Sequence, residues 1–325
     1  MSVTKGGYDM GSDRKRRRAD PVQGGSIWQK IWKNRMVYTL LLPGLVWYII
    51  FAYGPMGGLS LAFKEYKASL GILGSPWIGL ENYEYVFRDA AFLKSIVRTL
   101  TINLGRMVFV FPVSILLALI INELRFPKLK KGIQTILTFP HFLSWVVVAS
   151  IMINILSYDG LVNSALEQLG LPTVNFLGNP SGFVPLLYAS AIWKQAGWDA
   201  IIYLAAISGI DMDQYEAAQI DGAGRFKKIF YITLPNIMPT IAVMFILAMG
   251  QVMSAGFDQI FNLSNAAVKD VAETLDVYIY RITFQSTPDF GFSTAVSLFR
   301  SVVNMVLLLI ADKGSKLLGS DGLLG

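Results

Sequence analysis

Long apolar runs separated by polar connections dominate the chain. About 20 consecutive apolar residues in a helix cover the roughly 30 Å of hydrocarbon in a bilayer. The runs predict six membrane spans, at residues 37–63, 95–121, 133–156, 183–209, 237–263 and 292–311. They fill close to half of the 325 residues, show no internal repeat and leave little material for a soluble domain. The predicted fold class is therefore all-α, a polytopic helical membrane protein.

Composition supports this class and argues against several kinds of chemistry. Charged residues make up 15% of the chain, whereas soluble domains carry about 25%. The absence of cysteine excludes disulfides, thiolate metal sites and cysteine nucleophiles. The single histidine, His141, has no second imidazole with which to build a histidine-based zinc site. We expect no metal or cofactor bound by this chain.

The distribution of Lys and Arg predicts the orientation, because cytoplasmic loops carry the excess of positive charge. Eighteen of these residues fall in one set of connections and six in the other. The richer set is 1–36, 122–132, 210–236 and 312–325, and the poorer set is 64–94, 157–182 and 264–291. We therefore expect both termini in the cytoplasm.

The basic run at residues 14–18 precedes the first span. In that position we expect a tail that touches anionic lipid, with no nucleic acid as partner. Trp28 and Trp32, with Ile27 and Ile31, recur at helical spacing and predict a short interfacial helix. Residues 1–36 are thus a basic tail and interfacial helix, 37–311 the membrane domain, and 312–325 a cytoplasmic tail.

Two short helices are predicted in the connection 211–239, between the fourth and fifth spans. Asp213 can cap a first helix whose third position is Glu216. Ala217 and Ala218 favour a slim helical turn, and Gly222 supplies the backbone freedom needed where this helix ends. A second stretch carries apolar residues on one side and basic residues on the other, and prolines terminate it. These residues are Phe226, Ile229, Phe230 and Ile232, then Arg225, Lys227 and Lys228, then Pro235 and Pro239.

This connection resembles the EAA motif of ABC importer permeases. The motif runs Glu-Ala-Ala, three residues, Gly-Ala, a spaced aromatic residue and a terminal Leu-Pro. The matching stretch holds Glu216, Ala217, Ala218, Asp221, Gly222, Ala223, Arg225, Phe226, Leu234 and Pro235. The resemblance extends over spans two to six, in the arrangement of the maltose-type permeases. The start of the chain, from Pro43-Gly44 through Tyr53-Gly54-Pro55, is similar to the branch that imports complex oligosaccharides and polysaccharides, alginate included.

The resemblance implies a type I-like permease subunit in the cytoplasmic (inner) membrane of a bacterium, which moves an oligo- or polysaccharide inward. It implies a second, homologous permease in a heterodimer, two ATPase subunits and an extracytoplasmic solute-binding protein as partners. The loop would dock in a cleft of an ATPase subunit, with Glu216 at the groove and the apolar side from Phe226 to Leu234 anchored to the membrane domain. The chain has no G-x-x-x-x-G-K-[ST] phosphate loop, so ATP-Mg would belong to the ATPase subunits and this subunit would be non-catalytic.

Polar residues inside the spans mark a candidate substrate pathway, because such residues usually face a bundle interior or an aqueous cavity. They are Asn103, Arg106, Trp193, Lys194, Trp198, Asp199, Gln251, Asp258, Arg300 and Asn304. If the three cations and two acids among them line one cavity, its formal charge is +1, which favours an acidic saccharide. The alternative is that they pair across helices and contact no ligand.

Two other functions compete with the importer. A secondary transporter of a polar solute predicts inverted repeats and broken helices that carry ion ligands, and the sequence reveals neither. An intramembrane transferase needs paired carboxylates or a metal constellation, for which Asp199 and Asp258 are poor candidates. ATP dependence separates the importer from both.

Overall fold

The computed structural model describes residues 27–254, 256–285 and 288–317. The basic run at 14–18 and the tail from 318 lie outside these residues. The described parts contain helices and a single isolated bridge, between Lys64 and Trp77. They divide into two units, residues 1–57 and residues 58–325, which are described separately.

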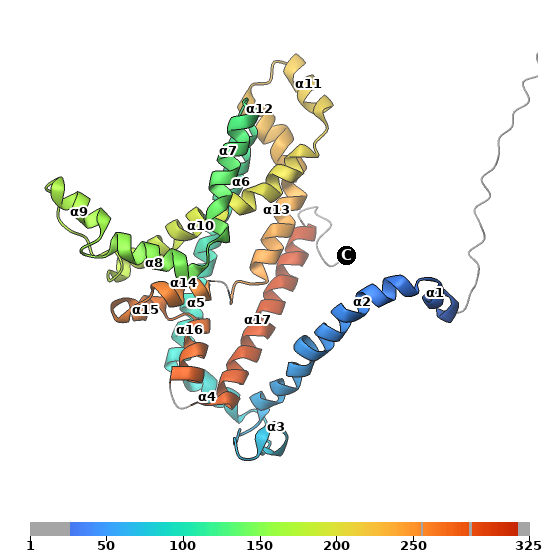
Figure 1. Ribbon diagram of the computed structural model, residues 1–325, viewed down its shortest axis with the longest axis vertical. Coiled ribbons are helices and arrows are strands. Elements are labelled where there is room, and N and C mark those ends of the chain that lie inside the picture. The colour runs from blue at the N-terminus through green and yellow to red at the C-terminus, as the bar shows by residue number, and fades with distance from the viewer. Residues whose placement is uncertain (1–26, 255, 286–287, 318–325) are drawn as a thin grey trace, which may run out of the picture. The chain divides into compact units, whose positions relative to one another are not determined.

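The first unit is an apolar helical rod. It comprises α1 (Ile27–Lys33), α2 (Arg35–Tyr48) and the π-helical turn η1 (Ile49–Tyr53), which leads into the 3-10 segment η2 (Gly54–Phe63) (Figure 1). None of its described side chains is buried, and Trp28 and Trp32 on α1 are 78% and 72% exposed. An apolar helix that buries nothing in its own fold meets lipid or another protein.

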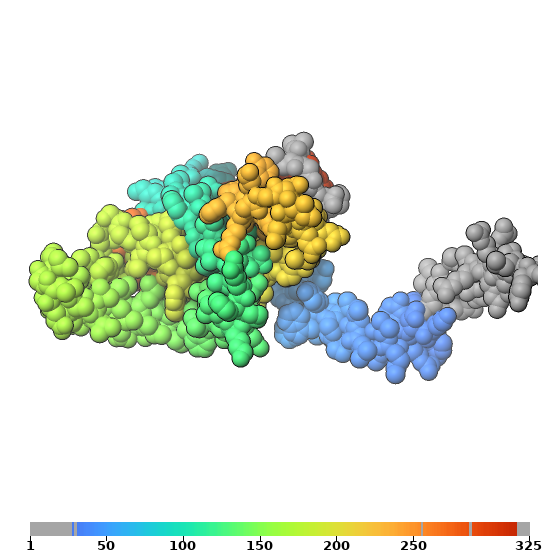
Figure 2. All heavy atoms as spheres, turned by 90° about the horizontal axis from the view of Figure 1, so that it is seen from above, coloured from blue at the N-terminus to red at the C-terminus, as the bar shows by residue number. Residues whose placement is uncertain are grey.

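The second unit holds the other helices. They are α3 (Gly71–Gly74), α4 (Glu81–Arg88), α5 (Ala90–Phe109), α6 (Phe111–Asn122), α7 (Pro127–Thr138), η3 (Phe139–Phe142), α8 (Trp145–Leu156), α9 (Leu161–Gln168), α10 (Pro180–Ser208), α11 (Met212–Ile220), α12 (Arg225–Lys228), η4 (Ile229–Thr233), α13 (Leu234–Met249), α14 (Phe257–Leu263), η5 (Ala266–Val268), α15 (Lys269–Ala272), α16 (Leu275–Tyr280), η6 (Arg281–Gln285) and α17 (Phe290–Leu317). In Figure 1, α11 and α12 lie at one end of this unit and α4 at the other. Figure 2 shows the yellow-green segment that carries α9 projecting to one side.

Five helical stretches of the described chain are long and apolar enough to cross a membrane. They are Arg35–Phe63, Ala90–Asn122, Trp145–Gln168, Arg225–Met249 and Phe290–Lys316. The expected fourth span coincides with α10, whose 29 residues would extend about 43 Å at 1.5 Å per residue. Lys194 and Asp199 near its middle make α10 less apolar than the others.

Helix α10 is the central element of the unit. It packs against α6, α7 and α13, and Tyr203 and Ile207 join one buried cluster with Ile237 of α13. Farther toward its start, Phe183 and Leu187 join another cluster with Ile260 of α14. Helix α10 can carry charged residues near its middle because neighbouring helices cover most of its surface.

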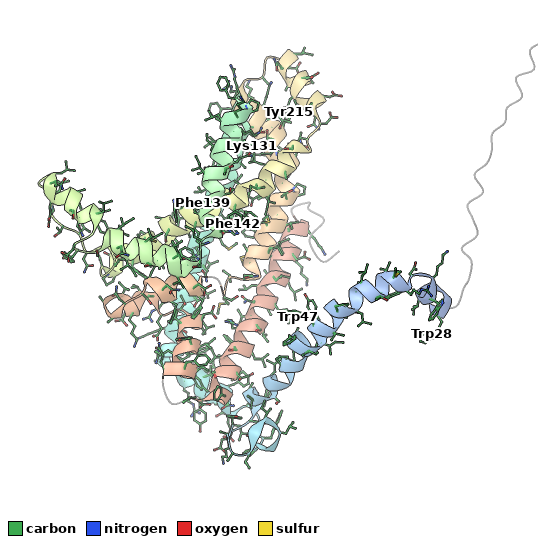
Figure 3. The ribbon with its side chains drawn as sticks, viewed as in Figure 1. Trp28, Trp47, Lys131, Phe139, Phe142 and Tyr215 are labelled. Atoms are coloured by element: carbon green, nitrogen blue, oxygen red, sulfur yellow. The ribbon has the colours of Figure 1, made fainter. Side chains whose placement is uncertain are left out.

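The expectation of unbroken spans is wrong at two places. The third expected span, 133–156, is divided into α7, η3 and α8, with Phe139 and Phe142 at the break (Figure 3). The fifth, 237–263, stops at Met249 and resumes as α14 after Gly256, whose φ is +90°. Proline in the first break removes a backbone donor, and glycine in the second permits a left-handed residue.

Close approach of α10 to α7 holds the first break in place. Gly197 lies directly against the backbone of α7, so that a Cβ added there would stand 2.5 Å from the carbonyl carbon of Leu137. The Lys194 ammonium donates a hydrogen bond of 2.8 Å to the His141 carbonyl. Small residues allow helices in membranes to approach closely, and a lysine that satisfies a freed carbonyl stabilises the break.

Candidate coupling loop and central cavity

Asp211 starts the first helix of the loop, and the expected cap at Asp213 is wrong. The Asp211 backbone is extended, and its carboxylate accepts a 3.0 Å hydrogen bond from the Asp213 N–H. Asp213 is therefore the second residue of α11, where a negative charge favours the helix dipole. Glu216 is the fifth residue of α11 and does not occupy the third position that the sequence predicts for it.

Gly222 ends this helix as its position in the motif predicts. Its φ is +73°, the left-handed conformation that glycine adopts without steric cost. The Ala223 N–H donates to the Ala218 carbonyl at 2.8 Å, and the Gly222 N–H donates to the Gln219 carbonyl at 3.1 Å. These two bonds form a Schellman motif, so the turn is a defined structure.

Side-chain hydrogen bonds fix α11 relative to the helix that follows. The Tyr215 and Thr233 hydroxyls are 2.9 Å apart, and the Asn236 amide donates to Gln214 at 3.0 Å. At the start of α12, the Arg225 guanidinium lies 3.8 Å from the Glu123 carboxylate at the end of α6. Both helices of the loop are thus tied to neighbouring elements.

The apolar side of the second stretch is divided between two environments. Ile229, Ile232 and Leu234 pack against the buried cluster of α6 and α10, as expected. Phe226 and Phe230, however, are 79% and 62% exposed, so the expectation that the whole side anchors to this chain is wrong for them. Side chains of this size left exposed mark a surface that another molecule covers.

Most of the predicted coupling residues lie at the surface of the loop. Glu216, Ala217, Asp221, Gly222, Arg225, Phe226 and Pro235 are exposed, and Ala218, Ala223 and Leu234 are half-buried. The Glu216 carboxylate makes no hydrogen bond or ion pair within the described chain. An unpartnered carboxylate beside two alanines on a rigid helix is a surface that a basic groove can approach closely.

A cavity of about 470 Å³ opens between α5, α6, α10 and α13. Four of the ten predicted pathway residues line it: Asn103, Arg106, Asp199 and Gln251. Ser114 and Tyr203 line it too, and neither was predicted from the sequence. Tyr203 follows Asp199 by one helical turn, a spacing that could have marked it.

Arg106 is the cation of this cavity. Its guanidinium lies against Gly256 at the second break and donates a hydrogen bond to the side-chain oxygen of Gln259. Gln259 is fully buried and donates in turn to the Leu187 carbonyl at 2.8 Å and the Ser190 hydroxyl at 2.7 Å.

Three polar atoms at the cavity wall lack partners. The Nε of Arg106, the Oδ1 of Asn103 and the Oγ of Ser114 are buried without a hydrogen bond. Within the described residues no carboxylate pairs with Arg106. A buried cation without a counter-ion is costly, and a ligand that brings an anion would offset that cost.

The expectation that all five pathway charges line one cavity is wrong. Lys194 is bonded to the His141 carbonyl, Arg300 pairs with Asp276 of α16, and Asp258 is exposed on α14. Only Arg106 and Asp199 remain at the cavity, and their formal charges cancel. The Asp199 carboxylate accepts a 2.9 Å hydrogen bond from Gln195.

The remaining predicted pathway residues lie elsewhere. Trp198 stacks on His141 with ring centres 4.4 Å apart, and Trp193 is 52% exposed. Asn304 accepts a hydrogen bond from the Met253 N–H at 2.9 Å and donates to Ser254 at 3.0 Å. Asn304 therefore satisfies backbone freed by the second break. No metal-binding group of His, Cys, Asp or Glu was found in the described parts of the chain.

Comparisons with known proteins agree with one another. Residues 111–313 match the family described as binding-protein-dependent transport system inner membrane component. The polygalacturonan/rhamnogalacturonan transport system permease protein YteP of Bacillus subtilis is 40% identical over 295 residues, covering 90% of this chain and 92% of that protein. The crystal structure of a bacterial alginate ABC transporter, in complex with an alginate pentasaccharide-bound periplasmic protein, contains a chain that is 38% identical. It superposes with a TM-score of 0.84 over 91% of this chain and 99% of that chain.

Proposed function

The chain belongs to the family of binding-protein-dependent transport system inner membrane components, and we propose that it is the permease subunit through which an ABC importer moves an acidic oligo- or polysaccharide into a bacterial cell. The observation that supports this most strongly is the match over nine tenths of the chain to a permease of an alginate importer. YteP, with a polygalacturonan in its name, supports the same class of substrate. Alginate and polygalacturonan are both chains of sugar acids.

The loop around α11 would supply the coupling. Two ATPase subunits that close on ATP-Mg would pull the exposed surface around Glu216. Because hydrogen bonds tie α11 to η4 and α13, the displacement would pass to the helices that line the cavity. The partners are then a second permease, two ATPases and a solute-binding protein, and the chain itself would perform no chemical step.

The cavity would hold part of the saccharide during passage. Asn103, Gln251 and Tyr203 offer hydrogen-bonding groups for hydroxyls. Arg106 would bind a carboxylate, because a guanidinium matches a carboxylate in shape and charge. The three unpartnered atoms at the wall would gain partners when the saccharide enters.

The alternative function, a secondary transporter of a polar solute, has less support than the ABC importer. The two breaks are a feature of that class, but the family and the relatives are those of ABC importers. Both breaks are also satisfied by protein groups, Lys194 and Asn304, which leaves no need for a coupling ion.

We expect an Arg106→Gln substitution to reduce uptake of acidic oligosaccharides selectively. A hydrogen bond to a charged group contributes about 1.5–3 kcal/mol, and about 1.4 kcal/mol is a factor of ten. Uptake of an oligogalacturonate should therefore fall at least about tenfold relative to its carboxyl-reduced counterpart. Initial rates of uptake in vesicles, each divided by the wild-type rate, measure this ratio.

Lys194→Gln is the matched control, because its ammonium is bonded to the His141 carbonyl and does not line the cavity. It should slow both oligosaccharides equally. If Arg106→Gln also slows uptake of both oligosaccharides equally, Arg106 supports the fold and does not bind the carboxylate of the substrate.

We also expect the end of the unit that carries α11 to face the cytoplasm. The loops 122–132 and 210–236 meet there, joined by Arg225 and Glu123, and both carry excess positive charge. A reporter fused after residue 225 should be active in the cytoplasm, and one fused after residue 275 should be active outside. The opposite result at residue 225 would place the coupling surface out of reach of an ATPase.

A further inference from the structure

A second pocket lies apart from the central cavity, in the segment between α14 and η6. Its volume is about 320 Å³, within the lower range of ligand sites. Phe261, Lys269, Glu273, Tyr280, Arg281 and Gln285 are among its lining residues, and none of the central-cavity residues is shared. Ten of its eleven lining residues fall between 264 and 285, in the connection that the charge distribution predicts to face outward.

One wall of this pocket is aromatic. The rings of Phe261 and Tyr280 meet edge to face, with centres 4.7 Å apart. The row continues to Phe257 on one side and to Phe284 on the other, each at 5.3 Å from its neighbour. Phe284 is 68% exposed. Sugar rings present C–H faces that pack on aromatic rings while their hydroxyls stay hydrated, so a partly exposed aromatic row fits a saccharide.

The rest of the lining carries an excess of positive charge, which comes from Lys269. The Glu273 carboxylate is 2.6 Å from Arg281 and 3.8 Å from Arg98, so two arginines share it. Lys269 is exposed, and its ammonium forms no ion pair or hydrogen bond with any described residue. Lys269 and Arg281 against Glu273 leave one formal positive charge in the lining. The Tyr280 hydroxyl, likewise without a partner among the described residues, can bond a sugar hydroxyl.

We propose that this pocket is an outer saccharide subsite, which holds one sugar-acid residue before the saccharide enters the central cavity. The sugar ring lies against Phe261 and Tyr280, and its carboxylate pairs with the Lys269 ammonium. The subsite rests on the proposed import of an acidic saccharide and adds a second point of contact to it. The aromatic row leads inward, because Phe257 follows Gly256, which lies against the Arg106 guanidinium.

The charge of Lys269 gives the subsite a selective test. The complete transporter in vesicles is supplied with saturating binding protein, loaded either with an oligogalacturonate or with its carboxyl-reduced counterpart. Rates are divided by those of wild type, so that the preference of the binding protein cancels. Lys269→Gln should lower the rate for the acidic oligosaccharide about fivefold and leave the reduced one unchanged, as loss of one partly screened ion pair predicts. Tyr280→Leu should slow both.

Lys94→Gln is the matched control, since Lys94 is an exposed lysine of α5 outside the pocket. The subsite is wrong if Lys269→Gln behaves like Lys94→Gln. It is also wrong if Lys269→Gln slows both oligosaccharides equally and removes stimulation of ATP hydrolysis by the binding protein, because the pocket would then dock that protein.

Photocrosslinking tests occupancy without transport. A benzoylphenylalanine in place of Gln285 should form an adduct with labelled oligogalacturonate, and excess unlabelled oligogalacturonate should suppress it. The same group in place of Lys94 should form none. Wild type that takes up neither oligosaccharide would refute the proposed function, whereas normal wild-type uptake without a crosslink at residue 285 would refute the subsite alone.

Discussion

Replacing Glu216 by lysine should abolish ATP-driven uptake while leaving the protein folded in the membrane. Glu216 is exposed and its carboxylate makes no hydrogen bond or ion pair within the described chain, and substitutions at such positions change stability by about 0.5 kcal/mol or less. A reversed charge at a basic groove instead opposes docking, and like charges across an interface cost several kcal/mol. Uptake should fall more than about a hundredfold, measured with the amount of inserted protein held constant.

Glu167→Lys is the matched control for this change. Glu167 is an exposed acid on α9, far along the chain from the coupling loop, and its reversal should leave uptake within about twofold of wild type. Uncoupling gives a second readout, because ATP hydrolysis by the Glu216→Lys transporter should no longer respond to the loaded binding protein. Normal uptake by Glu216→Lys would remove α11 from the coupling surface.

Gly197→Ala should destabilise the membrane domain by more than the addition of one methyl group suggests. The new Cβ would overlap the carbonyl of Leu137, which is backbone and cannot rotate aside. Helices α7 and α10 would have to separate, and overpacking of this kind costs about 1–3 kcal/mol. The separation would also lengthen the bond from Lys194 to the His141 carbonyl. Thermal unfolding of the purified transporter should shift down by several degrees.

Gly182→Ala on the same helix provides the comparison. A Cβ there would meet its nearest neighbour, the Asn179 side chain, at 3.7 Å, an ordinary contact. Because alanine is also the better helix former, Gly182→Ala should leave the melting temperature unchanged or raise it slightly. Equal melting temperatures for the two variants would contradict the close packing of α10 on α7.

The structure of the candidate coupling loop, residues 211–239, could largely be predicted from sequence because the interactions that define its turn are local. The bonds around Gly222 join residues that lie within five positions of one another. The helix start was placed wrongly because Asp211 and Asp213 can both cap, and the local pattern favours neither. The exposure of Phe226 and Phe230 was missed for another reason. Periodicity identifies an apolar side but does not say which molecule covers it.

The helix breaks could not be predicted, because proline and glycine do not break every helix in a membrane protein. Pro43, Pro185 and Pro239 all lie inside continuous helices. What separates the break at Pro140 from these is a distant partner, Lys194, for the freed carbonyl. The break before α14 likewise depends on Asn304, about fifty positions away. Tertiary partners re-satisfy the backbone at such breaks.

The partners of the charged residues in the spans could not be predicted either, because they are also distant along the chain. The sequence places Arg106, Lys194 and Arg300 inside the spans, but that position does not identify the partner of each cation. Arg300 pairs with Asp276, which lies in a segment expected to be a loop. Lys194 bonds a backbone carbonyl, a partner that no charge pattern reveals. Of the three cations, Arg106 lines the cavity and has no acidic partner among the described residues, which makes it the strongest candidate for contact with an acidic substrate.

Uptake by the purified transporter in sealed vesicles tests the proposed function most directly. Labelled oligogalacturonate and the binding protein are placed outside, and ATP-Mg or a non-hydrolysable analogue inside. We expect saccharide to accumulate only with hydrolysable ATP and binding protein together, and to do so equally when a protonophore abolishes the proton gradient. Accumulation without ATP that stops when the protonophore is added would instead show that the chain works as a secondary transporter.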